Sequence, residues 1–257
     1  MATVELNGHP TWVKRGRGRG PRLVLLHGGL SSSASLLRSV GPRLGRSFSL
    51  SAFDRRGHGR TVDTDEAFHY ESMADETIAF LEWLGGRAHL LGHSDGGIVA
   101  MLTALRRPDL VNRVVAVGTN FHFDAVATPA NLTFEGPDFD QWAQEFGARS
   151  PDGVGHARAA ADKSLALFAT EPTLTPSDLA AMTRPVLVMA GDDDVVDLEH
   201  TVVLYQSLPE AQLAIVPGTS HAVLKERPKA AARIIRRFLT QRLPPVTLQP
   251  VRRAPRA

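Results

Sequence analysis

The chain has 257 residues, of which 43% are hydrophobic and 22% charged, with a formal net charge of +2 and no cysteine. These values fit one large α/β domain or two small ones in a globular protein. The lack of cysteine excludes disulfides, thiolate catalysis and Cys-ligated metals. No apolar run reaches the roughly 18 residues that span a bilayer, and residues 1–8 lack the pattern of a secretory signal. We therefore expect a cytoplasmic protein that has no membrane partner.

Two stretches of the chain are rich in basic residues, one from Lys14 to Arg22 and one from Arg252 to Arg256. Basic clusters can bind nucleic acid. Here no aromatic residues interleave with them, and no nucleic-acid-binding module is visible. We expect a solvated loop and a tail, and no nucleic-acid partner. No pattern in the chain predicts an oligomeric state.

Segments with strand and helix character alternate along most of the chain. A turn signal at Asn7-Gly8 predicts a hairpin over residues 4–13. Apolar runs typical of buried strands lie at 22–26, 48–53, 88–91, 111–117, 185–190 and 212–216. Helical spacing predicts helices at 36–44, 72–84, 97–107, 199–208 and 229–243. The alternation implies an α/β fold with a mostly parallel, doubly wound sheet and right-handed crossovers.

Residues 120–182 interrupt this alternation. They contain no strong strand and carry nine acidic against three basic residues, a net charge of −6. We expect a small helical cap over the pocket, inserted between a first core segment (1–119) and a second (183–243). Residues 244–257 are rich in Pro and Arg without periodicity, which predicts a disordered tail.

The stretch from His89 to Met101 predicts a strand, a tight turn and a helix, with Ser94 at the tip of the turn. A serine in G-x-S-x-G at this place sits on a strained elbow and points out of the sheet. Gly92 and Gly96 fit because side chains there would collide with the neighbouring strand and helix. A bare G-x-S-x-G also occurs by chance as a structural turn, so the rest of the chain has to support the catalytic interpretation.

Ser94, Asp194 and His221 each follow a different predicted strand. The carboxyl ends of parallel strands share one edge of the sheet, where ligands bind. A serine needs a neighbouring base, histidine suits that role near neutral pH, and a carboxylate orients the histidine. Nucleophile-elbow hydrolases have this chain order. Asp192 and Asp193 are alternatives for the acid, and the three consecutive carboxylates are also a conceivable cation site.

Two backbone N–H groups are candidates for an oxyanion hole. One belongs to Asp95, at the start of the helix after the elbow, and the other to Gly29, after His27-Gly28. The side chain of Asp95 has two interpretations: it binds a cationic group of the substrate, or it hydrogen-bonds within the protein. Leu30 and His122 are further candidates for substrate contacts.

Five motifs in order give the sequence a resemblance to the α/β-hydrolase family over about residues 3–243. They are H-G-G at 27–29, D-x-R-G-x-G at 54–59, G-H-S-D-G at 92–96, G-x-x-D at 191–194 and G-x-x-H at 218–221. The resemblance implies an α/β-hydrolase fold and a Ser94–Asp194–His221 triad that works without cofactor or metal. The G-x-x-D spacing of the family selects Asp194 over the two aspartates before it.

Within that family, G-H-S-D-G-G-I and the short cap resemble the group that contains valacyclovir hydrolase, the biphenyl hydrolase-like proteins. That group has an aspartate directly after the nucleophile, used to hold the α-ammonium of amino-acid esters, and Asp95 is the matching residue here. The sequence departs from the group at His93, where tryptophan is common.

We therefore expect a serine hydrolase that cleaves a small or medium carboxylic ester, with an amine-bearing ester as one candidate substrate. One alternative is cofactor-free C–C bond hydrolysis or perhydrolysis with the same triad. Another is a ligand-binding or regulatory protein that retains the fold.

Overall fold

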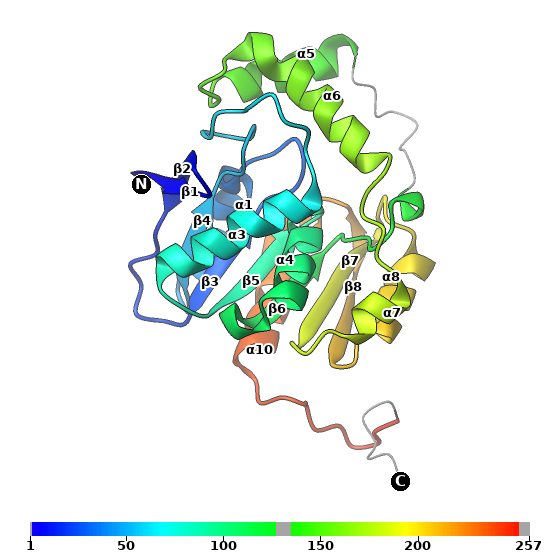
Figure 1. The fold of residues 1–257 in the computed structure, drawn as a ribbon. Coiled ribbons are helices and arrows are strands. Elements are labelled where there is room, and N and C mark those ends of the chain that lie inside the picture. The colour runs from blue at the N-terminus through cyan, green and yellow to red at the C-terminus, as the bar shows by residue number, and fades with distance from the viewer. Residues whose placement is uncertain (1, 127–134, 252–257) are drawn as a thin grey trace.

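The computed structural model describes residues 2–126 and 135–251, which are built around an eight-stranded sheet (Figure 1). The strand order is β1-β2-β4-β3-β5-β6-β7-β8. β1 pairs antiparallel with β2, and β2 antiparallel with β4, whereas every other pair is parallel. The bounds are Ala2–Leu6 (β1), His9–Lys14 (β2), Arg22–Leu26 (β3), Ser49–Phe53 (β4), Ala88–His93 (β5), Val111–Val117 (β6), Val186–Asp193 (β7) and Ala211–Ser220 (β8).

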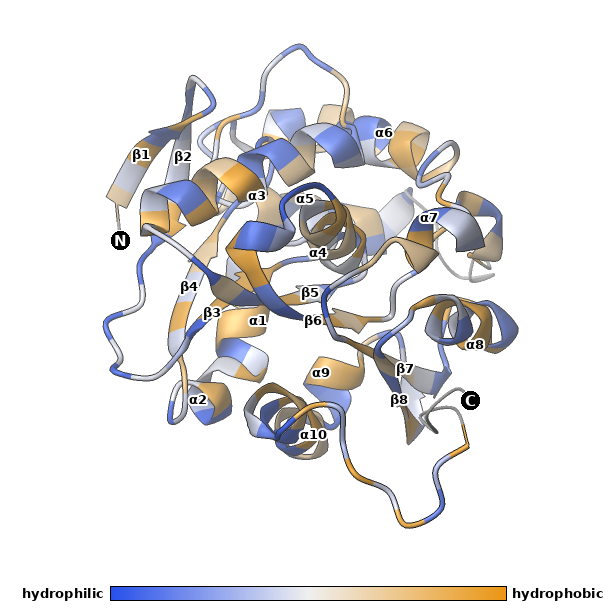
Figure 2. Cartoon of the chain, turned by 60° about the horizontal axis from the view of Figure 1, so that its bottom comes forward, coloured by the Kyte–Doolittle hydropathy of each residue, from blue (hydrophilic) through white to orange (hydrophobic). Residues whose placement is uncertain are grey.

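Helices cover both faces of the sheet, as the continuous apolar runs predicted (Figure 2). Leu90 and Leu91, neighbours on β5, are both fully buried but belong to different apolar clusters on the two sides. One side holds α3 (Tyr70–Leu84), α4 (Asp95–Arg106) and α8 (Leu198–Ser207). The other side holds α1 (Ser33–Ser39), α2 (Gly41–Leu44), α9 (Val223–Glu226) and α10 (Pro228–Thr240). The doubly wound α/β architecture is confirmed.

The described part of the insertion between β6 and β7 is helical. It contains α5 (Gly136–Gly147), α6 (Ala157–Phe168) and α7 (Pro176–Ala180). In Figure 1, α5 and α6 lie above the ends of the strands, whereas α7 packs beside α8. Residues 127–134 of the predicted cap lie outside the described residues, and the division into a core and a separate cap domain over 120–182 stays a prediction.

Several predicted boundaries differ from the structure. The helix predicted over 36–44 is two helices, α1 and α2, because Pro42 lies in the first turn of α2 and has no N–H to continue the first one. β7 and β8 run further than predicted, to Asp193 and Ser220. Their extension matters for the site, since it carries the two strands as a pair up to the functional loops.

The sequence makes a prediction for the N-terminal hairpin and for the C-terminal segment. The predicted hairpin turn is confirmed, with Asn7 and Gly8 at φ 50° and 73° between β1 and β2. Residues 244–251 contain neither helix nor strand, and the rest of the predicted tail lies outside the described residues. Within residues 2–126 and 135–251, no helix has the length and apolar character needed to cross a membrane.

Candidate active site

Ser94 occupies the turn between β5 and α4, with φ 54° and ψ −123°. Such a backbone conformation costs a non-glycine residue roughly 1–3 kcal/mol, so the surroundings must impose it. The Ser94 N–H donates to the carbonyl of Val117 at 2.8 Å. A Cβ atom at Gly92 would lie 1.9 Å from the carbonyl oxygen of Gly96, and one at Gly96 would lie 2.1 Å from that of Leu26. The two glycines therefore allow the strained elbow that the sequence predicted.

Asp194 and His221 lie side by side because β7 and β8 stay paired to their last residues, across a register shift between Gly191 and Asp193. Asp193 and Ser220 are partners across the two strands, and the next residue of each chain is Asp194 or His221. His221 Nδ1 is 2.6 Å from Asp194 Oδ1. Since an ionised carboxylate only accepts, Nδ1 carries a proton and Nε2 is left to face other groups.

The carboxylate of Asp194 is only 2% exposed. Burial acts to raise the pKa of Asp194, but the hydrogen bond and charge of His221 and the N–H groups of Val196 and Gly191 outweigh it, so the pKa lies below its ordinary value. Asp194 is therefore ionised at neutral pH.

The other two aspartates of the run point elsewhere. Asp192 Oδ1 accepts the Thr219 N–H at 3.1 Å, and both Asp192 and Asp193 are exposed. Of the three consecutive carboxylates, the structure places Asp194 on His221. Within the described ranges, no group of three or more His, Asp or Glu side chains is arranged to hold a metal ion.

Gly118, directly after β6, is a site residue that the sequence analysis missed. Its φ is +56°, and a Cβ atom there would lie 2.9 Å from His221 Nδ1 and 3.2 Å from Asp194 Oδ2. Any side chain at this position would push the aspartate and the histidine apart. The available signal was a glycine at the end of a buried strand, where close approach to the backbone is one reason for glycine.

The buried Arg55 side chain hydrogen-bonds the loop after β3, which runs from His27 to Leu30. Arg55 is 1% exposed, and its guanidinium donates to the carbonyl oxygens of His27 at 2.6 Å and Gly28 at 3.3 Å. His27 Nδ1 lies 2.8 Å from the same Gly28 oxygen, and His27 Nε2 accepts the Arg55 N–H at 3.2 Å. His27 is thus neutral with its proton on Nδ1, which agrees with a pKa that burial and the charge of Arg55 lower well below its ordinary value.

These contacts fix the direction of the Gly29 N–H. In a trans peptide the N–H points opposite to the carbonyl of the same peptide unit. With the Gly28 oxygen turned to His27 and Arg55, the Gly29 N–H points away from them. It has no acceptor within the described residues. The predicted oxyanion donor is therefore free to bind a ligand.

Asp95 follows Ser94 and is only 4% exposed. Burial raises the pKa of its carboxyl, while the charge of Arg55 and a hydrogen bond from the Tyr70 hydroxyl act in the opposite direction. A Cβ atom at Gly29 would lie 2.6 Å from Asp95 Oδ2, so the carboxylate borders the loop that carries the Gly29 N–H. These surroundings favour the interpretation in which the Asp95 side chain bonds within the protein.

Three other histidines, His93, His58 and His122, occupy different places. His93 Nε2 contacts the His221 carbonyl at 2.8 Å, and burial with the nearby His221 lowers the pKa of His93 to about 4. His58 is buried against His27 and Phe68, with a pKa lowered to about 4, first by burial and then by the charge of Arg55. His122 pairs with the carboxylate of Asp124 and is not brought to the loops around Ser94 by any contact among the described residues; its role in substrate binding stays a prediction.

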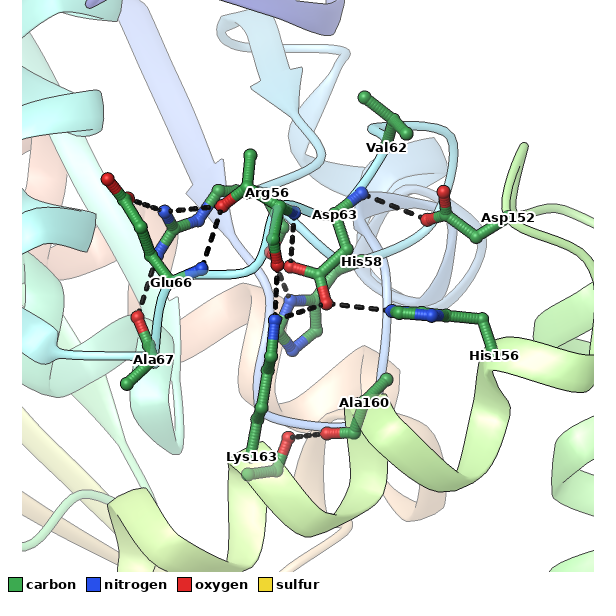
Figure 3. A network of polar contacts seen from close by, with 12 residues as sticks. Arg56, His58, Val62, Asp63, Glu66, Ala67, Asp152, His156, Ala160 and Lys163 are labelled. Atoms are coloured by element: carbon green, nitrogen blue, oxygen red, sulfur yellow. Dashed lines mark hydrogen bonds and ion pairs between the residues drawn. The ribbon is translucent and has the colours of Figure 1, made fainter.

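Polar contacts join α5 and α6 to the core at two places, in addition to the apolar contact of Leu167 with the core. Trp142 Nε1 of α5 donates to the Leu30 carbonyl at 2.8 Å, which joins α5 to the loop that follows β3. Figure 3 shows the second point, where Asp63 of the core meets α6 and the turn before it. Asp63 Oδ2 is 2.8 Å from both His156 Nε2 and Lys163 Nζ, and the Asp63 N–H donates to an Asp152 oxygen at 2.9 Å.

Comparison with known proteins agrees with this arrangement. Residues 23–234 match the alpha/beta hydrolase family, and the chain belongs to that family. A 2-(acetamidomethylene)succinate hydrolase of Mesorhizobium japonicum is 26% identical over 259 aligned residues, covering 90% of this chain and 92% of the relative. The sn-1-specific diacylglycerol lipase ABHD11 of Mus musculus is 28% identical, covering 85% and 81%.

A solved structure with the same fold is that of a serine hydrolase involved in carbazole degradation. It has a TM-score of 0.77 with 21% identity and covers 93% of this chain and 98% of its own. This likeness shows the fold. Together with the family match, it makes the chain an α/β-fold hydrolase. The resemblance to the valacyclovir hydrolase group stays a prediction.

Proposed function

We propose that the protein is a serine hydrolase that cleaves carboxylic esters through an acyl-enzyme, with Ser94 as nucleophile, His221 as base and Asp194 as its orienting acid. The observation that carries the proposal is the 2.6 Å contact between Asp194 and His221, at the sheet edge where the strained Ser94 projects. Within the described residues Ser94 Oγ has no hydrogen bond to the protein. Catalytic hydrogen bonds are often loose before substrate binds.

In the first half-reaction, Ser94 Oγ attacks the ester carbonyl carbon while its proton passes to His221 Nε2. The carbonyl oxygen becomes an oxyanion, which the N–H groups of Gly29 and Asp95 stabilise. As the C–O bond to the alcohol breaks, His221 returns the proton to the leaving oxygen. Water then attacks the carbonyl carbon of the acyl-enzyme while His221 takes a proton from it. His221 gives that proton to Ser94 Oγ as the acid leaves, which restores free Ser94.

The electrostatics around His221 suit this cycle. Asp194 is ionised and stabilises the imidazolium that forms on His221. His93, whose ring centre lies 4.9 Å from that of His221, has a pKa of about 4 and is neutral at neutral pH. The neighbouring ring therefore adds no competing positive charge while His221 holds the serine proton.

The substrate is the finer part of the proposal. The relatives carry names with different substrates, a succinate derivative in one case and diacylglycerol in another, so neither substrate transfers to this chain. An aminoacyl ester would need the Asp95 carboxylate to face the substrate. The burial of Asp95 beside Tyr70 and Arg55 favours a simple ester over an amine-bearing one.

The test compares wild type with Ser94→Ala on a panel of simple acyl esters, aminoacyl esters and a dienoic ketone, with peroxide as an added acceptor. We expect ester cleavage that falls about a thousandfold or more in Ser94→Ala, while Ser207→Ala, at the end of α8, keeps the wild-type rate. A fluorophosphonate should label wild type at Ser94. Normal ester cleavage by Ser94→Ala would refute the mechanism, and cleavage of the ketone alone would move the proposal to C–C hydrolysis.

A further inference from the structure

A cavity of about 540 Å³ opens beside the loop that follows β3, between α1, α5 and the start of α10. Four basic side chains line it and only one acidic side chain, Glu145. The basic residues are Arg38 of α1, Arg43 of α2, Lys225 of α9 and Arg149, which follows α5. Hydroxyl groups and aromatic rings complete the wall: Ser31, Ser32, Ser35, Ser39, Trp142 and Phe146.

These four cations are not neutralised by the protein. Within residues 2–126 and 135–251, none of them takes part in an ion pair. Arg149 donates to the Glu145 carbonyl at 2.9 Å, and Arg43 reaches the Ser39 carbonyl at 3.5 Å, both neutral acceptors. Like charges around one cavity repel, and an anion bound among them removes that repulsion and gains charge-assisted hydrogen bonds.

The cavity is connected to His221. A second cavity of about 220 Å³ shares Ser35, Ser39 and Lys225 with the first and is also lined by His93 and His221. Lys225, His93 and His221 together line the smaller cavity, so this lysine is close to the histidine pair. A ligand that extends from the large cavity into the smaller one therefore reaches the proposed base.

The negative composition of the cap does not oppose an anion here, because several of its acids are engaged elsewhere. Asp152 accepts the N–H of Asp63, Glu171 pairs with His69 and accepts the Tyr70 N–H, and Asp178 caps α7. Of the three basic residues of the cap, Arg149 lines the cavity, together with the acidic Glu145. The whole cap has a net charge of −6, but its charged residues at this cavity, Glu145 and Arg149, carry no net charge together.

We propose that this cavity binds an anionic group of the substrate, a carboxylate or phosphate that lies beyond the ester bond, and that Arg38 and Lys225 select for it. The proposal rests on the proposed ester hydrolysis and gives it a substrate class. Arginine binds carboxylate and phosphate oxygens in a forked geometry, and lysine adds a point charge.

The test measures kcat/KM on matched esters with and without an anionic group. On the acyl side the pair is mono-4-nitrophenyl glutarate and 4-nitrophenyl methyl glutarate. On the alcohol side, the acetate esters of 5-hydroxypentanoate and of 4-hydroxybutyl phosphate are compared with that of methyl 5-hydroxypentanoate. We expect the kcat/KM of wild type to be at least about tenfold higher for an anionic ester than for its neutral counterpart, either on the acyl side or on the alcohol side. The ester that shows this preference identifies the anionic group and the side of the ester bond on which it lies.

The variant is the double substitution Arg38→Gln and Lys225→Gln, two exposed positions. Its preference for the anionic ester should fall about tenfold or more, while Arg19→Gln, an exposed arginine outside both cavities, keeps the wild-type preference. Cleavage of the neutral esters with no preference for the charged ones overturns this inference and leaves the proposed function standing.

Absence of any ester cleavage would count against the proposed function. The anion site can still be tested in that case by measuring binding. Calorimetry on full-length Ser94→Ala should show monobutyl glutarate bound more tightly than butyl methyl glutarate. The double substitution in the same background should remove the difference. Equal affinity for the two esters, or an unchanged difference after the substitutions, contradicts the anion site.

Discussion

Arg55 is a buried cation whose hydrogen-bond partners are carbonyl oxygens of the loop after β3. Its Nε atom is buried without a hydrogen-bond partner, so the position is not optimised for stability alone. The two contacts it does make determine which way the Gly28 carbonyl, and hence the Gly29 N–H, points. On the proposed mechanism, Arg55 is a positioning residue for the oxyanion hole.

Replacing Arg55 with lysine removes the fork that bonds two carbonyls at once. We expect kcat to fall about ten- to a hundredfold with little change in KM, because the Gly29 N–H acts mainly on the transition state. Affinity for a trifluoromethyl ketone, which forms a tetrahedral oxyanion, should fall by the same factor. Arg56→Lys is the matched control, since Arg56 points instead to Glu66, Thr64 and the Ala67 carbonyl. Equal losses in both variants would show a general effect on the loop.

The site residues that the sequence predicted follow strands, whereas the missed ones are defined by contacts with residues far away in the sequence. Ser94, Asp194 and His221 were predictable because each follows a strand, and parallel strands bring such residues to one edge. Gly118 was not, because its requirement arises from His221 and Asp194, which reach it only in the folded sheet. Arg55 occupies the variable position of D-x-R-G-x-G, so the motif gave no signal for its partners.

At the scale of elements, the Asp63 carboxylate of the core makes polar contacts with α6 and the turn before it, in addition to the apolar contact of Leu167 with the core. The Asp63 side chain is 2% exposed and bonds His156 and Lys163 (Figure 3). Burial acts to raise the pKa of Asp63, but the hydrogen bonds from Lys163 and His156 and the charge of Lys163 bring it below its ordinary value. This contribution to stability is present above the ordinary pKa of aspartate and is lost as the pH falls through the lowered one.

We expect Asp63→Asn to loosen the attachment of α6 to the core. The substitution leaves Lys163 without its anion and should lower the free energy of unfolding by about 2 kcal/mol. Hydrogen exchange in α6 should accelerate more than in α3 or α4. The control is Asp162→Asn, also on α6, whose pairing with Arg158 is exposed and contributes little. Unchanged exchange in α6 would mean that other contacts hold the helix.

The helices and strands were predicted well where the residues that define them are close together in the sequence. The strands and the hairpin at Asn7-Gly8 follow from apolar runs and turn residues. The split of α1 from α2 depends on a single proline, Pro42, and the lengths of β7 and β8 depend on their mutual pairing beyond the apolar run. Strand ends of this kind are set by tertiary hydrogen bonds, which the local sequence does not encode.

On the scale of the whole molecule, buried histidines make the fold sensitive to acid. Burial lowers the pKa of four histidines from 6.5 to about 4, His58, His89, His93 and His200. His200 Nε2 accepts the Phe121 N–H at 3.0 Å, so its protonation breaks that bond. Below pH 6.5 the unfolded chain binds protons that the folded chain excludes, and stability falls.

Two buried carboxyl groups act in the opposite sense. Burial raises the pKa of Glu76 to about 7 and also raises that of Asp95, so both hold a proton more readily in the fold. Counting His27 with the other four histidines, we expect a net uptake of about three protons on unfolding near pH 5.5. Tm should therefore fall steadily from pH 7 to pH 5. A Tm that is level over this range would contradict the buried neutral state of these histidines.

The order of the site residues along the chain has a consequence for synthesis of the protein. Gly29 and Ser94 precede the insertion, whereas Asp194 and His221 follow it on β7 and β8. The two groups meet across the pairing of β6 with β7, from Val114–Val186 to Val117–Met189. On the proposed mechanism, a chain emerging from the ribosome carries its serine without a base until β8 has been added. The nascent hydrolase is thereby inactive until its sheet is complete.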